Sequence, residues 1–140
     1  MMDAQVAVES SQTHVISSDA DVVNIRQSVR TIAVTAKLSL IDQTKLVTAV
    51  SELARNTLVH GGGGEATIEI VTADAQRGVR VGFSDAGPGI RDVSLALTDG
   101  WTSGTGLGLG LSGARRLVDE FELRSEHGNG TTVSVVKWTR

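Results

Sequence analysis

The glycines of this chain gather in three clusters, at positions 61–64, 82–89 and 100–113. A flexible linker spreads its glycines, whereas clusters mark places where the backbone turns tightly or approaches another group closely. Apart from Gly82, the last two clusters fall in one stretch, SDAGPGIRDVSLALTDGWTSGTGLGLGLSGARR, which runs from Ser84 to Arg116. We therefore expect a fold that holds these backbone segments close to a neighbouring group such as a ligand.

The size and composition are those of one ordinary domain, which we expect to span residues 1–140. A chain of 140 residues can bury about two-thirds of its unfolded surface, so it needs no disulfide or metal for stability. The sequence contains no cysteine, no apolar run near the roughly 20 residues of a membrane span, and no signal-peptide pattern at its start. These features favour a cytoplasmic protein. A formal net charge of −3 with mixed signs argues against electrostatically driven nucleic-acid binding.

Two helices are predicted in the first half of the chain. Apolar residues recur at three- and four-residue steps from Asp19 to Ala36, which predicts the first helix. Ser39 with Asp42 three residues later is typical of a capped helix start, and the second helix should run from there to the glycines at 61–64. Residues 1–18 show few helix signals, and we expect them to be an edge strand or partly flexible.

Alternating apolar residues predict strands in the second half. Strands are expected at 65–72 and 78–84, a short helix near 92–97, a helix from about Gly108 to Glu120, and a final hairpin of 121–125 with 131–137. Helices followed by mostly antiparallel strands indicate an α+β two-layer sandwich with the helices on one face of the sheet.

Asp85 ends a predicted strand and opens the tight turn Asp85-Ala86-Gly87-Pro88-Gly89. A carboxylate there can accept a hydrogen bond from an exocyclic amine such as adenine N6. A buried acceptor of this kind discriminates strongly, because the wrong base leaves it unpaired. Gly87 and Gly89 would let the backbone pass under the ring. An ordinary turn capped by an aspartate explains the same residues, so this motif alone leaves both interpretations open.

A second glycine-rich loop leads into the last predicted helix. Its residues are Gly104, Thr105, Gly106, Leu107, Gly108, Leu109 and Gly110. Backbone N–H groups in such a loop, and at the helix start beyond it, suit phosphate oxygens. The loop lacks the Lys-Ser/Thr of a P-loop and does not occupy the first strand–helix turn of a Rossmann unit. Taken alone, it is equally consistent with a surface loop.

Glu52 and Asn56 lie four residues apart, so they project from one face of the second predicted helix, away from its apolar stripe. An asparagine oxygen is a hard ligand suited to Mg²⁺, which keeps phosphates and waters as its other ligands. Glu52 could take a proton from an attacking hydroxyl or water. A solvated polar face would be the default explanation if this pair stood alone.

Together, in this order, the three motifs resemble the GHKL ATP-binding family of gyrase, histidine kinases, MutL and the heat-shock chaperone. The N box of that family is similar to Glu52-Leu-Ala-Arg-Asn56, its G1 box to Asp85-Ala-Gly-Pro-Gly89, and its G2 box to Gly104–Gly110. The resemblance covers nearly the whole chain from about residue 20. Within the family, the run DGWTSGTGLGLGLSGARRLVDEF is most similar to the RsbT-type serine/threonine kinases of the anti-sigma regulatory factor group.

The resemblance implies a Bergerat-type fold with ATP and Mg²⁺ as cofactors. Asp85 would bind adenine N6, Asn56 would hold Mg²⁺ and Glu52 would be the catalytic base. The Gly104–Gly110 loop would cover the phosphates. Gly130-Thr131 matches the family's Gly-Thr at the adenine edge, with Thr132 as the alternative to Thr131.

The implied activity is phosphorylation of a serine or threonine in a small STAS-domain antagonist or scaffold protein, in a partner-switching pathway. A downstream phosphatase or a sigma factor would be a further partner. Two alternatives stay open: an anti-sigma factor kinase that sequesters its sigma factor, and a non-catalytic nucleotide-dependent binding module. An intact Glu52 favours an enzyme, because a pure binder needs no base there. The sequence does not assign an oligomeric state.

Overall fold

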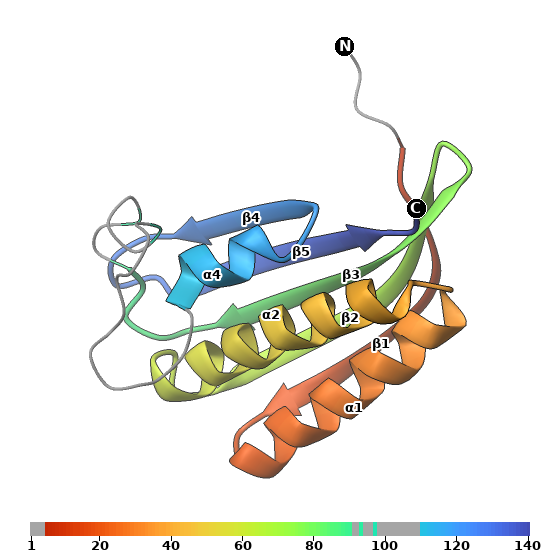
Figure 1. The fold of residues 1–140 in the computed structure, drawn as a ribbon. Coiled ribbons are helices and arrows are strands. Elements are labelled where there is room, and N and C mark those ends of the chain that lie inside the picture. The colour runs from red at the N-terminus through yellow and green to blue at the C-terminus, as the bar shows by residue number, and fades with distance from the viewer. Residues whose placement is uncertain (1–4, 91–92, 94–96, 98–109) are drawn as a thin grey trace.

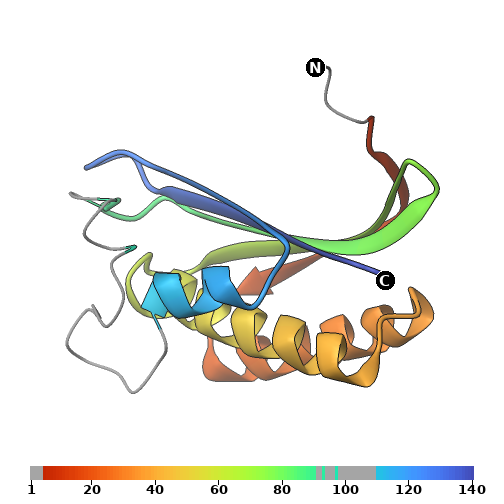
Figure 2. The same cartoon turned by 45° about the horizontal axis from the view of Figure 1, so that its top comes forward.

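A computed structural model of the chain describes residues 5–90, 93, 97 and 110–140. These residues form a two-layer sandwich in which all the helices cover one face of a five-stranded sheet (Figures 1 and 2). The strand order is β1-β2-β3-β5-β4, and every neighbouring pair is antiparallel. The predicted α+β class is confirmed. The elements are β1 (Ala7–Ile16), α1 (Asp19–Thr35), α2 (Leu40–Val59), β2 (Gly64–Ala73), β3 (Gln76–Asp85), α4 (Gly110–Arg116), β4 (Glu120–Ser125) and β5 (Thr131–Trp138).

The two long helices form an antiparallel hairpin, and each begins at a serine cap (Figure 1). The Ser18 hydroxyl accepts from the Asp21 backbone N–H at 3.3 Å, and the Ser39 hydroxyl accepts from the Asp42 N–H at 3.1 Å. Each cap satisfies one of the N–H groups that a helix start leaves unpaired. The predicted bounds of both helices are confirmed to within a few residues. The cap at Ser39 was visible in the sequence, whereas the first helix was predicted from its apolar spacing alone.

The sheet presents alternate residues of each strand to the helices, and these form the core. On β3 the inward residues Val79, Val81 and Phe83 are all buried. They pair across β5 with Lys137, Val135 and Val133 respectively. Asp85 continues the same inward series at the end of β3, because side chains alternate between the faces of a strand.

The N-terminal segment is a continuous edge strand with an irregularity between Val8 and Ser10, so the expected edge strand is confirmed. One predicted element differs from the structure. The last helix ends at Arg116, so its predicted end at Glu120 is wrong. The Asp119 N–H donates to Val136 O at 2.9 Å. This bond starts the pairing with β5, so the helix ends earlier than its sequence pattern predicts. The predicted helix at 92–97 lies largely outside the described residues, as do Gly108 and Leu109 at the predicted start of the last helix.

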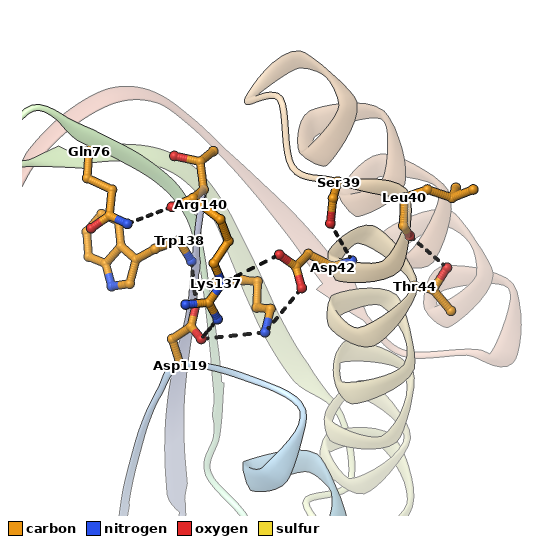
Figure 3. A network of polar contacts seen from close by, with 10 residues as sticks. Ser39, Leu40, Asp42, Thr44, Gln76, Asp119, Lys137, Trp138 and Arg140 are labelled. Atoms are coloured by element: carbon orange, nitrogen blue, oxygen red, sulfur yellow. Dashed lines mark hydrogen bonds and ion pairs between the residues drawn. The ribbon is translucent and has the colours of Figure 1, made fainter.

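A buried ion network joins the first turn of α2 to the end of β5 and to Asp119, the residue before β4 (Figure 3). Lys137 has a side chain only 4% exposed, and its Nζ lies 3.5 Å from Asp42 Oδ1 and 3.5 Å from Asp119 Oδ1. Arg140 also contacts both carboxylates, and the Trp138 N–H donates to Asp119 at 2.7 Å. A buried charge is tolerated only when it is paired and hydrogen-bonded in this way. The network therefore fixes the start of α2 against β5.

The stability of the fold should depend on pH through Asp119. Burial raises the pKa of this carboxyl, but the Trp138 N–H and the charges of Lys137 and Arg140 outweigh burial and hold the pKa below its ordinary value of 3.8. A carboxyl with a lowered pKa stabilises the folded state above its unfolded pKa, and this contribution is lost as pH falls through the folded pKa. We expect urea denaturation to show a deficit in unfolding free energy for Asp119→Asn at neutral pH that shrinks below about pH 4. A deficit that stays constant across this range would contradict the ion network.

Candidate functional site

Asp85 lies where the end of β3 meets the C-terminal end of α2. Its carboxylate Oδ1 accepts a hydrogen bond from the Gly87 backbone N–H at 2.9 Å, which fixes the orientation of the side chain. The residue is half-buried rather than buried. A carboxylate held at one oxygen by the protein, at the rim of the helix layer, is positioned to accept a further hydrogen bond from a ligand.

Gly61 makes this position of Asp85 possible, whereas the sequence had assigned it only to the end of the second helix. A Cβ at Gly61 would collide with the Asp85 carboxyl group, and a Cβ at Gly87 would lie 2.8 Å from the Gly61 backbone. The Gly61 N–H in turn donates to Asn56 O at 3.2 Å. Glycine lets the turn after α2, Asp85 and the turn after β3 come together. The signal was visible as the glycine cluster that directly follows the helix bearing Glu52 and Asn56.

The turn after Asp85 is fixed against the start of β5. Gly89 has φ +75°, a conformation that favours glycine, and a Cβ there would collide with the Glu126 carbonyl. The Ser125 hydroxyl accepts from the Ile90 N–H at 2.7 Å and lies 2.8 Å from the Thr131 hydroxyl. Ser125 is thus a second residue that sequence reasoning missed, because it acts by joining two segments distant in the sequence.

The strand register distinguishes Thr131 from Thr132, the two residues that the sequence offered for the position at the adenine edge. Thr131 pairs with Asp85 and therefore shares its helix-facing side of the sheet, whereas Thr132 pairs with Ser84 on the opposite side. Thr131 is half-buried and Thr132 is exposed. Of the two hydroxyls, the one on Thr131 is thus the one next to Asp85.

Glu52 and Asn56 occupy the outward face of α2, in its last two turns. Both side chains are half-buried, and the flanking residues Leu53, Ala54 and Thr57 are buried. The Asn56 carbonyl accepts from the N–H groups of His60 and Gly61, so the backbone at Asn56 joins the segment that contacts Asp85. The helix therefore brings the predicted Glu/Asn pair to the same end of the molecule as Asp85.

The glycine-rich loop predicted to contact phosphates lies outside the described residues, apart from its last member. Gly104, Thr105, Gly106, Leu107, Gly108 and Leu109 are not described. Gly110 is described and is the first residue of α4, which packs beside α2 (Figure 1).

The donor set of this site suits a metal that is shared with a bound ligand. Among the described residues, no group of three or more His, Asp or Glu side chains could hold a metal on its own. Mg²⁺ does not require such a group, since it is commonly held by one or two protein oxygens with phosphates and waters. The amide oxygen of Asn56, with the Glu52 carboxylate one turn away, fits that requirement.

The contact between Gly61 and Asp85 predicts that Gly61→Ala will weaken nucleotide binding. The added methyl group would displace the Asp85 carboxylate, and we expect a loss in ATP affinity of roughly tenfold, the equivalent of one good hydrogen bond to a charged group. Calorimetric titration would measure this loss. Gly62→Asn is the control, because a Cβ at Gly62 meets nothing within 4 Å and asparagine tolerates its φ of +75°. Equal affinities for the two variants would contradict the close approach.

The chain matches known proteins in both sequence and fold. Residues 41–139 match the model of the histidine kinase-, DNA gyrase B- and HSP90-like ATPases. The chain is 40% identical over 125 residues to the serine/threonine-protein kinase RsbT of Bacillus subtilis, covering 89% of this chain and 94% of that protein. It is 31% identical over 121 residues to an anti-sigma F factor of Clostridium novyi, covering 79% of this chain and 85% of that protein.

A solved structure shares the fold. The RsbU and RsbW domains of a Mycobacterium tuberculosis protein superpose with a TM-score of 0.65 at 19% identity. The superposition covers 94% of this chain, which spans 33% of that longer one. At this identity the likeness concerns the fold alone, and it agrees with the sheet and helix layer described above.

Proposed function

The chain belongs to the family of histidine kinase-, DNA gyrase B- and HSP90-like ATPases, and we propose that it phosphorylates a small STAS-domain protein in a partner-switching pathway. Membership implies ATP binding, and the likeness to RsbT makes the chain a protein serine/threonine kinase. The observation that carries the proposal is the meeting of Asp85, Gly61 and Thr131 at the end of the helix that bears Glu52 and Asn56.

The proposed roles follow from the position of each group. Asp85 accepts a hydrogen bond from adenine N6, and the Thr131 hydroxyl lies at the same edge of the base. Asn56 holds Mg²⁺, which supplies charge neutralisation at the phosphates when bound. Backbone N–H groups of the Gly104–Gly110 loop contact the phosphate oxygens.

Glu52 is the proposed base for the transfer. It accepts the proton of the serine or threonine hydroxyl as that oxygen bonds to the γ-phosphorus, while the bond from phosphorus to the leaving oxygen of ADP breaks. Most of the rate enhancement in phosphoryl transfer comes from positioning and electrostatics. The site supports this, because Glu52 and Asn56 lie on a helix that is fixed at both ends, by the Lys137 network and by the Gly61 contact.

A second candidate function is sequestration of a sigma factor by the same kinase. The observation that favours it is the 121-residue similarity to an anti-sigma F factor. A downstream phosphatase that is activated by binding is the corresponding partner under the first proposal.

We place the activity in the cytoplasm, the compartment that the sequence composition favours. Separately, none of the helices in the described part of the chain has the length and apolar character of a membrane span.

The test of the proposed function is phosphoryl transfer to purified STAS-domain proteins from the same organism. The kinase is incubated with γ-labelled ATP, with and without EDTA, and the product is analysed for phosphoserine and phosphothreonine. We expect one STAS-domain protein to be labelled, and EDTA to abolish the labelling. Tight binding of a sigma factor in addition to the labelling would favour the second candidate, and the absence of any labelled STAS-domain protein would contradict both candidates.

A further inference from the structure

The exposed side of α2 forms a continuous stripe that includes Glu52. At 3.6 residues per turn, its members fall within an arc of roughly 80°. They are Ile41, Lys45, Thr48, Glu52, Arg55 and Val59, which are exposed except for the half-buried Glu52. We call this surface the α2 stripe. It extends about three turns from Glu52 towards the start of the helix.

The exposed charges of the helix hairpin have one sign over most of its length. Between Asp21 and Glu52 the exposed charged residues are Arg26, Arg30, Lys37 and Lys45, all of them positive. The one acid in this range, Asp42, is 7% exposed and points into the network with Lys137 (Figure 3). The part of the helix hairpin between Asp21 and Glu52 thus exposes only positive charges, on a chain whose net charge is −3.

The start of the stripe is apolar as well as positive. Ile41 is 69% exposed, and its neighbour Leu40 is 71% exposed. Figure 3 shows Leu40 on the side of α2 that faces away from Asp42 and the ion network. The Ser39 cap and the Lys137 network hold this turn in place, so the two aliphatic side chains are presented on a fixed backbone. Exposed aliphatic side chains beside positive charges are typical of a protein-binding surface.

We propose that the α2 stripe from Ile41 to Thr48, together with the neighbouring Leu40, is the docking surface for the protein substrate, and that it selects an acidic surface beside the phosphorylated hydroxyl. The inference rests on the proposed function. A general base must come within hydrogen-bond reach of the hydroxyl it deprotonates, so the substrate must lie over the part of α2 that bears Glu52. Lys45 lies two turns from Glu52, about 10 Å along the helix axis. It therefore selects a substrate with an acidic residue at about that distance from the hydroxyl that is phosphorylated.

The test measures steady-state transfer to the STAS-domain protein that the wild type phosphorylates. Lys45→Glu and Ile41→Asn are compared with two control variants on the opposite face of the sheet. Arg124→Glu makes the same charge change at a side chain 81% exposed, and Val15→Asn matches Ile41→Asn at a residue 63% exposed. We expect each stripe variant to raise the KM for the protein substrate about tenfold, with kcat and the Kd for ATP unchanged. The wild-type KM should rise with salt, and less so in Lys45→Glu.

Four other results would contradict the proposal, and each would reject a different part of it. Transfer with an unchanged KM in both stripe variants would reject the docking surface and leave the kinase function standing. An equal rise in KM for Arg124→Glu would show a general effect of net charge. Binding of the wild type to vesicles containing phosphatidylserine, lost in Lys45→Glu with KM unchanged, would assign the stripe to membranes. No transfer by the wild type would reject the substrate class and the docking surface together.

Discussion

Asp85→Asn should lower the affinity for ATP by about 10²-fold while leaving the protein folded. The Gly87 N–H donates to Asp85 Oδ1, and an asparagine oxygen can keep that bond. The amide NH₂ would then take the place of the second carboxylate oxygen and present a donor where the adenine amine also presents a donor. Losing a hydrogen bond to a charged acceptor costs about 1.5–3 kcal/mol, and the unpaired donors add to this cost. Calorimetric titration with an ATP analogue, with and without Mg²⁺, measures the effect.

Asp74→Asn is the matched control for this change. Asp74 is exposed in the turn between β2 and β3, and its φ of 53° is one that asparagine tolerates. We expect wild-type ATP affinity and an unchanged unfolding midpoint for the control. Unchanged affinity in Asp85→Asn itself would remove Asp85 from the adenine role, and the Gly61→Ala prediction would fail with it.

The fold could be predicted from local signals because those signals agree with the tertiary structure. The cap at Ser39 marked the start of the second long helix, and the alternation through Val79, Val81 and Phe83 marked the inward face of β3. The spacing of Glu52 and Asn56 placed both on the outward face of α2, where the structure has them. Such signals depend on neighbours in the sequence, and a single sequence contains them in full.

The features that the sequence did not reveal depend on contacts between distant segments. Lys137 interrupts the apolar alternation of β5, and only the fold shows that Asp42 and Asp119 meet it there. The same is true of Gly61, whose importance comes from Asp85, 24 positions later in the numbering. The end of α4 was misplaced for this reason too, because the bond from Asp119 to Val136 competes with helix continuation.

Glu52→Gln should reduce phosphoryl transfer by about 10²–10⁴-fold while the Kd for ATP changes little. Glutamine has nearly the same shape and can still accept a hydrogen bond, but it cannot take the proton from the acceptor hydroxyl. Single-turnover transfer to the STAS-domain substrate measures the chemical step, and calorimetry on the same sample measures ATP binding. Retained binding would show that the variant is folded and that its Asp85 site is intact.

The matched control is Glu122→Gln on β4, whose carboxylate makes an exposed ion pair with Arg124. Exposed pairs of this kind contribute little, so we expect wild-type transfer from the control. Transfer that survives in Glu52→Gln would show that Glu52 is not the base. Positioning and charge neutralisation at Asn56 and the glycine-rich loop would then account for the rate. A loose phosphoryl-transfer transition state needs little help from a base, so this experiment separates proton transfer from positioning at the site.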